Sequence, residues 1–538
     1  MALRIESLPS RGGMLAVLFG VLGIGIFFGW ALGTGVTGLS IYVLESVLLL
    51  VLTLYQLSFG IFIFLLLMHV VPLIPASLRL PGVALADVYV FGLNVSNLVL
   101  LILMVSWGIR FVASRQGFRP LGPFGKLVVL HMAWITFSLL RTLMLGLLLP
   151  GQAHMDRPTA LIAVWRSNMI VPVISFLIMQ TAITPRYFIA IIRLYMTVMI
   201  IGIIWGLSPI VNFSGEIGLI SAQLRRAAVD IALLVPFFGV VVVLFVVSKK
   251  ALPRMVWIAL ACIAVLPVAY LRRRGIYLTT AIELIMASLF LVKLNRRYAF
   301  RVAVLLLITV AAGVLFMPHV VFDRIAYSYA YDPVSHEYVV DSSIEKRFIF
   351  WRVALDVLKR QWWMIPWGHG LGMSRVFMRD YIGRGMSVHN FWLQSLVDFG
   401  VIGVAIIIAV YVAQFRICRA MWRASNTLVM AFGISLAAFI IADQGTKLAH
   451  TFAFTGELQM MVWVISALAT TQLRPGGILA ESRLPDGRLG KELLGYSPDA
   501  VDDRDLGSAR RHAPPQRLSH RPAHAHPAPV QAVEQRRQ

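Results

Sequence analysis

The stretch MSVHNFWLQSLVDFGVIGV, residues 386–404, places several polar side chains at the start of an otherwise apolar segment. His389 can take a proton from an attacking hydroxyl group, because the pKa of a free imidazole lies close to neutrality. It can equally well cap the helix or bond to a lipid headgroup. Which of these roles applies depends on the surroundings of this helix start and on the charged groups opposite it.

Three separate arginine clusters are candidates for those charged groups. A guanidinium group presents a planar fork of donors that matches phosphate oxygens, and it stays charged. Two or three of them around one diphosphate would neutralise it and stabilise it as a leaving group. The alternatives are snorkelling to lipid phosphates and, for Arg226, an ion pair with Asp230 at i+4. The clusters are Arg225 with Arg226, then Arg272, Arg273 and Arg274, and finally Arg347 with Arg352.

The elements that carry these residues are predicted to be transmembrane helices. Hydrophobic residues make up 59% of the 538 residues and charged residues only 14%. The apolar stretches show no strand-like alternation, so we expect an all-α polytopic bundle with about 12 to 14 spans. The predicted spans are 14–36, 41–55, 57–73, 85–109, 125–149, 160–182, 186–208, 227–247, 254–271, 276–293, 300–317, 389–413, 425–443 and 451–472.

Loop charge predicts the orientation of these spans. If the N-terminus is inside and residues 41–73 form two short spans, the basic loops fall on one side, which the positive-inside rule makes cytoplasmic. The net charge of +23 then reflects these loops and the tail rather than nucleic-acid binding. The two cysteines, Cys262 and Cys418, predict neither a disulfide framework nor a zinc site. The basic loops lie near residues 110–126, 249–254, 293–301 and 416–423.

The same orientation divides the chain into a membrane domain, residues 1–473, and a disordered cytoplasmic tail, residues 474–538. Within the membrane domain, the long segment 318–388 and His389 are predicted to lie on the extracytoplasmic side. An amphipathic helix is expected in this segment after Ser342, suited to lying on the membrane surface. Its predicted apolar face consists of Phe348, Trp351, Leu355, Leu358 and Trp362, and the turn MIPWGHGLG, residues 364–372, follows it.

Arg141 lies inside the fifth predicted span. A charge within a membrane span indicates either a functional site or a structural pairing, and the sequence leaves both open.

The stretch HNFWLQSLVDFGVIGV resembles the hallmark HN-x-x-L-Q-x-x-x-E-x-G-x-x-G of the O-antigen ligase and polymerase superfamily, which are membrane enzymes that handle lipid-linked glycans. RFIFWRVALDVLKRQWWMIPWGHGLG resembles the family's arginine, its tryptophan four residues on, its helix and its Pro-x-x-G-x-G turn. RRRG, residues 272–275, resembles the family's Ser-Arg-Gly at the start of a span. The resemblance covers about residues 225–415, with Arg273 in place of the usual serine and Asp398 in place of the glutamate.

This resemblance implies that His389 is the base that activates the acceptor hydroxyl. Arg274 and Arg347 would bind the diphosphate of an undecaprenyl-diphosphate-linked sugar donor, with Arg225, Arg226 or Arg273 assisting. The transfer would invert the anomeric carbon without a metal ion or another cofactor, at the periplasmic face of a bacterial inner membrane. The implied supporting residues are Asn390, Gln394, Trp351 and Gly370, and His369 is a second candidate for the base.

The acceptor would be another repeat unit, as in a polymerase, or a lipid A core, as in an O-antigen ligase. Polymerisation is favoured, because nothing in the sequence singles out a core-binding surface. Other polysaccharide assembly proteins are possible partners. A transporter of an anion or of the lipid-linked sugar is an alternative, as is a non-catalytic assembly subunit. Transport predicts inverted repeats with Gly- or Pro-broken spans in matching halves, and none is evident.

Overall fold

The computed structural model describes twelve stretches of the chain. The chain divides into two compact units, residues 1–495 and 496–538, and every described residue belongs to the first. The predicted span 14–36 and the arginines Arg225, Arg226, Arg272 and Arg273 lie outside the described residues. The described stretches are 48–69, 95–114, 118–148, 158–212, 233–270, 274–316, 329–332, 337–340, 342–383, 387–448, 456–474 and 477–480.

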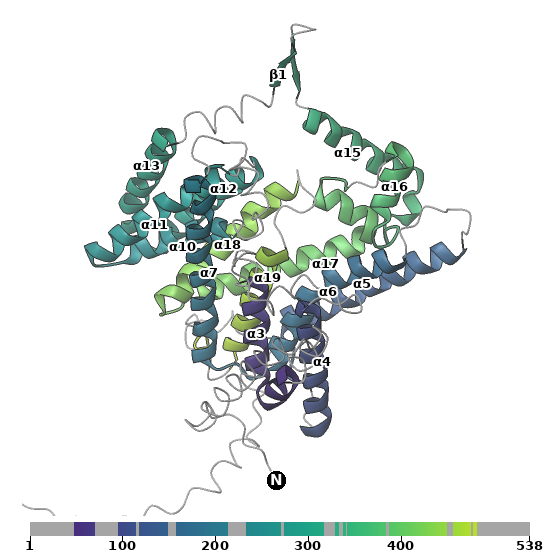
Figure 1. Ribbon diagram of the computed structural model, residues 1–538, viewed down its shortest axis with the longest axis horizontal. Helices are drawn as coiled ribbons and strands as arrows, with labels where there is room; N and C mark the ends of the chain where they lie inside the picture. The colour runs from purple at the N-terminus through teal and green to yellow at the C-terminus, as the bar shows by residue number, and fades with distance from the viewer. Residues whose placement is uncertain are drawn as a thin grey trace, which may run out of the picture. The chain divides into compact units, whose positions relative to one another are not determined.

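The predicted all-α polytopic membrane fold is confirmed (Figure 1). Among the described residues, seven helices are long and apolar enough to cross a membrane, and three shorter apolar helices accompany them. The helices are α3 (Leu57–His69), α4 (Val95–Ser114), α5 (Pro123–Leu148), α6 (Pro158–Gln180), α7 (Pro185–Asn212), α10 (Leu234–Val247), α11 (Ala251–Tyr270), α12 (Arg274–Leu294), α13 (Ala299–Phe316), α15 (Ser342–Arg360), α16 (Met373–Ile382), α17 (Phe391–Met421), α18 (Thr427–Lys447) and α19 (Gly456–Gln472).

The predicted break within residues 41–73 lies at Gln56, the one non-helical residue between helical residues 48–55 and α3. In a straight helix Thr53 and Gly60 would lie about 10 Å apart along the axis, whereas a Cβ atom on Gly60 would collide with the side chain of Thr53. The two helical pieces are therefore not one straight helix.

Helix α18 lies at the centre of one group of helices, where it packs against α10, α12 and α17. Its span is 72% buried, compared with 17% for α11. A span that contacts helices on several sides can carry polar residues that lipid would not tolerate. Helix α5 packs against α6 and α17, and α19 packs against α6.

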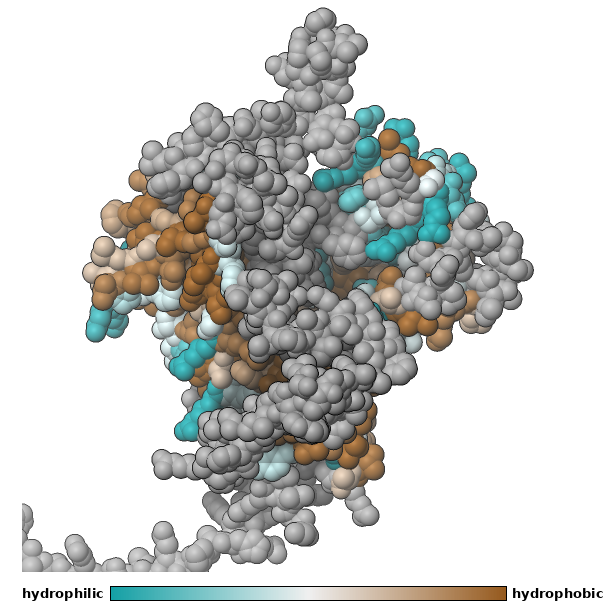
Figure 2. Space-filling model, in the orientation of Figure 1, coloured by the Kyte–Doolittle hydropathy of each residue, from teal (hydrophilic) through white to brown (hydrophobic). Residues whose placement is uncertain are grey.

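The segment between α13 and α17 contains a small antiparallel hairpin of β1 (Tyr329–Asp332) and β2 (Glu337–Val340), followed by α15 and α16. Figure 2 shows hydrophilic surface over α15 and α16, whereas the surface over α11 is hydrophobic. This contrast fits helices that lie outside the membrane beside helices that span it.

The predicted apolar face of α15 stays a prediction, because side chains that lie on a membrane surface are exposed in the protein alone. Leu358 is buried, but Phe348, Leu355 and Trp362 are exposed. The buried face consists instead of Phe350, Val353, Ala354, Val357 and Leu358. The reason is that α15 packs against α16 and α17 with this second face, so that its aromatic and basic stripe is left outside.

The prediction of one continuous helix from the hallmark histidine was wrong. Helix α17 breaks at Gly400, where φ is 71° and ψ is −175°. The rings of Trp392 and Tyr411 lie 6.3 Å apart, although a straight helix would separate their backbones by about 28 Å. The first arm, residues 391–399, therefore folds back along the second arm, residues 401–421.

Candidate functional site

The break in α17 is stabilised by the glycine-rich turn, residues 364–372, that follows α15. Breaking a helix leaves carbonyl oxygens and N–H groups without intrahelical partners. The N–H groups of His369 and Gly370 donate to the carbonyl oxygens of Val397 and Asp398, at 2.7 and 3.0 Å. In the opposite direction, the N–H groups of Val401 and Ile402 donate to the carbonyl oxygens of Ile365 and Pro366, at 2.9 and 3.2 Å. The turn thus replaces the helical bonds that the break removes.

The glycines of both motifs allow this close approach. Gly368 and Gly400 have positive φ angles of 75° and 71°, which non-glycine residues rarely adopt. A Cβ atom on either glycine would collide with the backbone of the other. A Cβ atom on Gly403 would collide with Trp134, whose indole N–H donates to the carbonyl oxygen of Phe399 at 3.0 Å. The glycine spacing of the hallmark is therefore explained by backbone packing.

Arg141 binds the same turn from α5. Its guanidinium group donates to the carbonyl oxygens of Trp367, at 2.9 Å, and Gly368. A Cβ atom on Gly370 would collide with the hydroxyl group of Thr142, one residue further along α5. Of the two readings left open by the sequence, these contacts favour the structural one for Arg141.

Asp398 and His369 also belong to this packing. The Asp398 carboxylate accepts from the backbone N–H of Ser374, at 2.8 Å, and from the Ser374 hydroxyl, at 3.1 Å. It thereby caps the start of α16, where a negative charge is favourable. His369 is 2% exposed, and its Nδ1 lies 3.2 Å from the carbonyl oxygen of Val397. Burial lowers the pKa of His369, and the nearby Arg141 charge lowers it further.

His389 lies beyond the free end of the first arm. Its backbone has a φ of 54°, the one positive φ of a non-glycine residue in the described stretches. Such strain is often stored at functional sites. Asn390 follows in an extended conformation and caps α17, since its side chain accepts from the N–H of Leu393 at 2.9 Å. The cap fixes the helix start and leaves His389 just outside it.

Helix α15 supplies the neighbours of His389. The imidazole stacks on Phe350, with ring centroids 5.7 Å apart and planes inclined by 23°. Arg347 is three residues before Phe350, so both side chains project from one face of α15. Burial lowers the pKa of His389, and the positive charge of Arg347 lowers it further. Both effects favour the neutral imidazole, the state in which it can accept a proton.

Of the predicted supporting residues, Trp351 lies close to this pair and Gln394 lies near Asp398. Trp351 is four residues after Arg347 and packs against the cluster that contains Phe350. Its buried indole N–H has no hydrogen-bond partner among the described residues. Gln394 follows one turn after Asn390, and its side-chain amide lies within hydrogen-bonding reach of Asp398.

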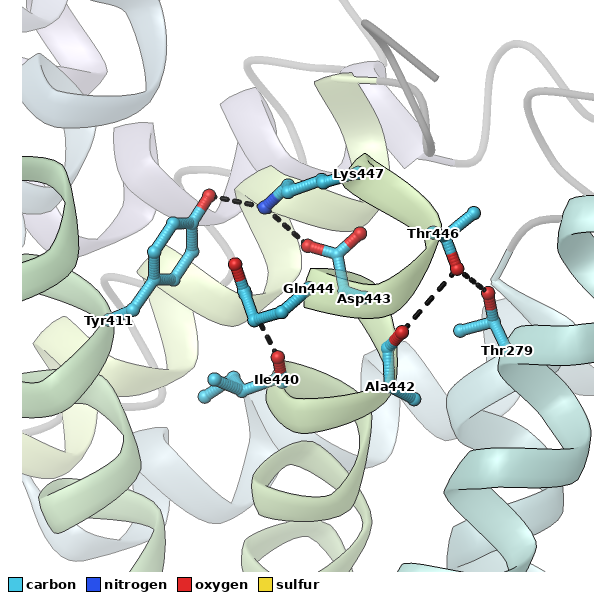
Figure 3. A network of polar contacts seen from close by, with 8 residues as sticks. All are labelled: Thr279, Tyr411, Ile440, Ala442, Asp443, Gln444, Thr446 and Lys447. Carbon is cyan, nitrogen blue, oxygen red and sulfur yellow. Dashed lines mark hydrogen bonds and ion pairs between the residues drawn. The ribbon is translucent and has the colours of Figure 1, made fainter. Parts of the chain in front are cut away.

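A buried polar cluster adjoins the start of α17 (Figure 3). The Lys447 ammonium forms an ion pair with Asp443 and donates to the Tyr411 hydroxyl. It also lies 4.9 Å from the ring centroid of Phe391, two residues after His389. The hydroxyl of Thr446 hydrogen-bonds to that of Thr279 in the second turn of α12, which begins at Arg274. The start of α12, the end of α18 and the start of α17 thus meet in one place.

The structure therefore brings His389, Arg347, Asn390 and Trp351 together, whereas it places Gly370 in the turn that supports the α17 break. Arg274 occupies the first position of α12. The prediction missed Asp443 and Lys447, because the predicted span ended at residue 443 and left Lys447 outside it. Their i, i+4 spacing in an apolar helix was a usable signal, since a charge inside a span indicates function or pairing. In the described part of the chain, no group of three or more His, Cys, Asp or Glu side chains is placed to hold a metal ion.

Comparison with known proteins bears on this region. Residues 268–408 match the family model described as O-antigen ligase. No curated protein is similar enough to the chain to count as a match. The matched segment runs from the end of α11 through α12, α15, the glycine-rich turn and the α17 break to residue 408, so it contains His389, Arg347 and Arg274 but not Arg141, Asp443 or Lys447. The resemblance seen in the sequence is confirmed for this segment, whose match supports the O-antigen ligase and polymerase superfamily.

Proposed function

We propose that the protein is a glycosyltransferase that uses an undecaprenyl-diphosphate-linked oligosaccharide as donor on the periplasmic side of the inner membrane. The observation that carries this proposal is the stacking of the partly buried His389 on Phe350, on the same helix face as Arg347, at a helix start inside the family-matched segment. A base beside a fixed cation suits a reaction that removes a proton at one atom and expels an anion at another.

In this reaction the acceptor hydroxyl oxygen forms a bond to the anomeric carbon of the donor sugar, with inversion. The bond between that carbon and the diphosphate oxygen breaks, and the electron pair leaves with the lipid diphosphate. His389 takes the hydroxyl proton. Arg347 and Arg274, assisted by Arg225, Arg226 or Arg273, neutralise the charge that develops on the leaving group, so no metal ion is required. Asn390 and Trp351 hold the base and the arginine helix in place.

Polymerisation of repeat units and ligation to a lipid A core differ only in the acceptor, and we favour polymerisation. The location of the site at the start of a span supports either reaction, because the diphosphate of a lipid-linked donor lies at headgroup depth. A transporter would not require a base fixed beside a cation by a separate helix.

The test uses the purified full-length protein in lipid, with an undecaprenyl-diphosphate-linked repeat unit. Released lipid diphosphate and product length are followed for the wild type, for His389→Ala and for His336→Ala, a control in the same predicted outer segment. We expect a ladder of lengthening glycans that His389→Ala reduces by at least 100-fold, the usual scale of a general base, and that His336→Ala leaves intact. Lipid release only after addition of lipid A core would identify a ligase. Equal turnover by His389→Ala would remove His389 from the mechanism, and absence of turnover with every acceptor would favour transport.

A further inference from the structure

We propose that Lys447 is a positioning residue for His389, whose buried ammonium group holds the first arm of α17 against the second. The proposal rests on the proposed function of His389 as the base. It concerns a residue outside both sequence motifs and outside the family-matched segment, residues 268–408.

The ammonium group of Lys447 is enclosed on all sides. Lys447 is 1% exposed and Asp443 is 4% exposed, and the ion pair neutralises both charges (Figure 3). A buried pair of this kind adds little stability relative to apolar side chains of similar size. Stability alone therefore does not account for a lysine at this position.

The cation contacts both arms of the broken helix. Its Nζ atom lies 4.1 Å from the ring centroid of Tyr411 in the second arm and 4.9 Å from that of Phe391 in the first arm. The aromatic rings attract a cation through their negative faces, and this attraction is stronger where water is excluded. The hydroxyl of Tyr411 accepts a further hydrogen bond from the same ammonium. One residue thus links the two arms at their open end, opposite the hinge at Gly400.

The link reaches His389 through the helix start. Phe391 is the first residue of α17, and Asn390 caps that helix directly after His389. Any displacement of Phe391 therefore moves the histidine relative to Phe350, on which it stacks at 5.7 Å. Because Phe350 and Arg347 belong to α15, a misplaced first arm separates the base from its cation.

The test distinguishes the effect of losing the cation at residue 447 from the effect of leaving the Asp443 carboxylate buried without a partner charge. Asp443→Asn/Lys447→Met removes both charges together, so no unpaired charge remains buried. Phe391→Leu removes only the ring, Lys447→Arg keeps a cation, and Lys250→Met removes an exposed lysine as a control. Two quantities are measured: kcat with the lipid-linked donor, and the pKa of His389 from the pH dependence of its modification by diethyl pyrocarbonate, detected by mass spectrometry.

We expect the double variant to fold with a melting temperature near that of the wild type. Its kcat should fall at least tenfold with donor KM within twofold, and the pKa of His389 should rise toward its ordinary value. Phe391→Leu should reproduce both changes, whereas Lys447→Arg and Lys250→Met should cause neither.

Wild-type kcat and wild-type His389 modification in the folded double variant would overturn the proposal. If the double variant does not fold, Phe391→Leu decides, because an unchanged pKa of His389 in that variant would equally overturn it. If the wild type turns over no donor, the proposed function fails, but the modification of His389 still tests this inference without any activity.

Discussion

His389 is held by residues of α15 rather than by its own helix. Phe350 provides a stacking surface, and Arg347 provides a positive charge that lowers the pKa of the imidazole. The arginine motif and the histidine motif are thus two parts of one site. The spacing of arginine and tryptophan in the upstream motif follows from helix geometry, since residues i and i+4 lie on one face.

The effect of Arg347 on the histidine predicts a pH shift. A base must be unprotonated, so kcat/KM should fall as the pH drops through the pKa of His389, which burial and the Arg347 charge lower. Arg347→Gln removes the repulsion between two cations, so the pKa rises and the fall begins at higher pH. Donor KM should also rise, by about tenfold for a lost contact of about 1.4 kcal/mol. pH–rate profiles of the two proteins measure both effects.

Arg360→Gln is the matched control, since Arg360 is exposed at the far end of the same helix. The acid limb of its pH–rate profile for kcat/KM should coincide with that of the wild type. A shift in Arg360→Gln as large as that in Arg347→Gln would show that net charge, rather than the Arg347 position, sets the pKa.

At the scale of elements, the α17 break and the glycine-rich turn form one structural unit. Four backbone hydrogen bonds join them, and Gly368 packs directly on Gly400. The unit aims the first arm of α17 back toward α18 and away from the path of a straight span.

Two glycine substitutions test this unit. Gly400→Ala adds backbone strain and a collision with the backbone of Gly368, so we expect a loss of roughly 3 kcal/mol or more and little folded protein. Gly383→Ala is the milder change, because φ of 74° and ψ of 4° lie in the left-handed region, whereas φ of 71° and ψ of −175° at Gly400 are accessible almost only to glycine. Its Cβ atom would also meet nothing within 4 Å. It should cost only about 1 kcal/mol. Melting temperatures and size-exclusion profiles in detergent distinguish the two, and equal behaviour would contradict the packing argument.

The helices themselves were predictable from the sequence. Predicted spans 160–182 and 254–271 correspond to α6, Pro158–Gln180, and α11, Ala251–Tyr270, because length and apolarity define a membrane helix locally. The break at Gly400 was not predictable in this way. Its stability comes from hydrogen bonds to residues 365–370, about thirty residues away, which no local pattern encodes. The stacking of His389 on Phe350 was missed for the same reason.

At the scale of the whole molecule, the protein is a multi-pass membrane protein. Its polar helices α15 and α16 lie in the chain between the apolar spans α12 and α17. The site is built where these helices meet the ends of α12, α17 and α18. Loop charge predicts that this end of the bundle faces the periplasm and that the α10–α11 loop faces the cytoplasm.

Cysteine labelling tests this orientation. In a Cys262→Ala/Cys418→Ala background, Lys359→Cys should react with a membrane-impermeant maleimide in intact spheroplasts, because Lys359 is exposed on α15. Lys250→Cys is equally exposed, but it should react only after lysis. Labelling of Lys250→Cys in intact spheroplasts would reverse the orientation and place His389 on the cytoplasmic side.

The reciprocal bonding of the glycine-rich turn with the α17 break also bears on biosynthesis. The N–H groups of Val401 and Ile402 complete this unit, and they are synthesised more than thirty residues after the turn that receives them. During translation the carbonyl groups of the turn therefore stay without these partners until α17 has entered the bilayer. The break in α17 must also have reached the side of the membrane on which the turn lies. The Lys447 contact forms later still. A nascent chain that has not finished inserting therefore lacks an assembled site.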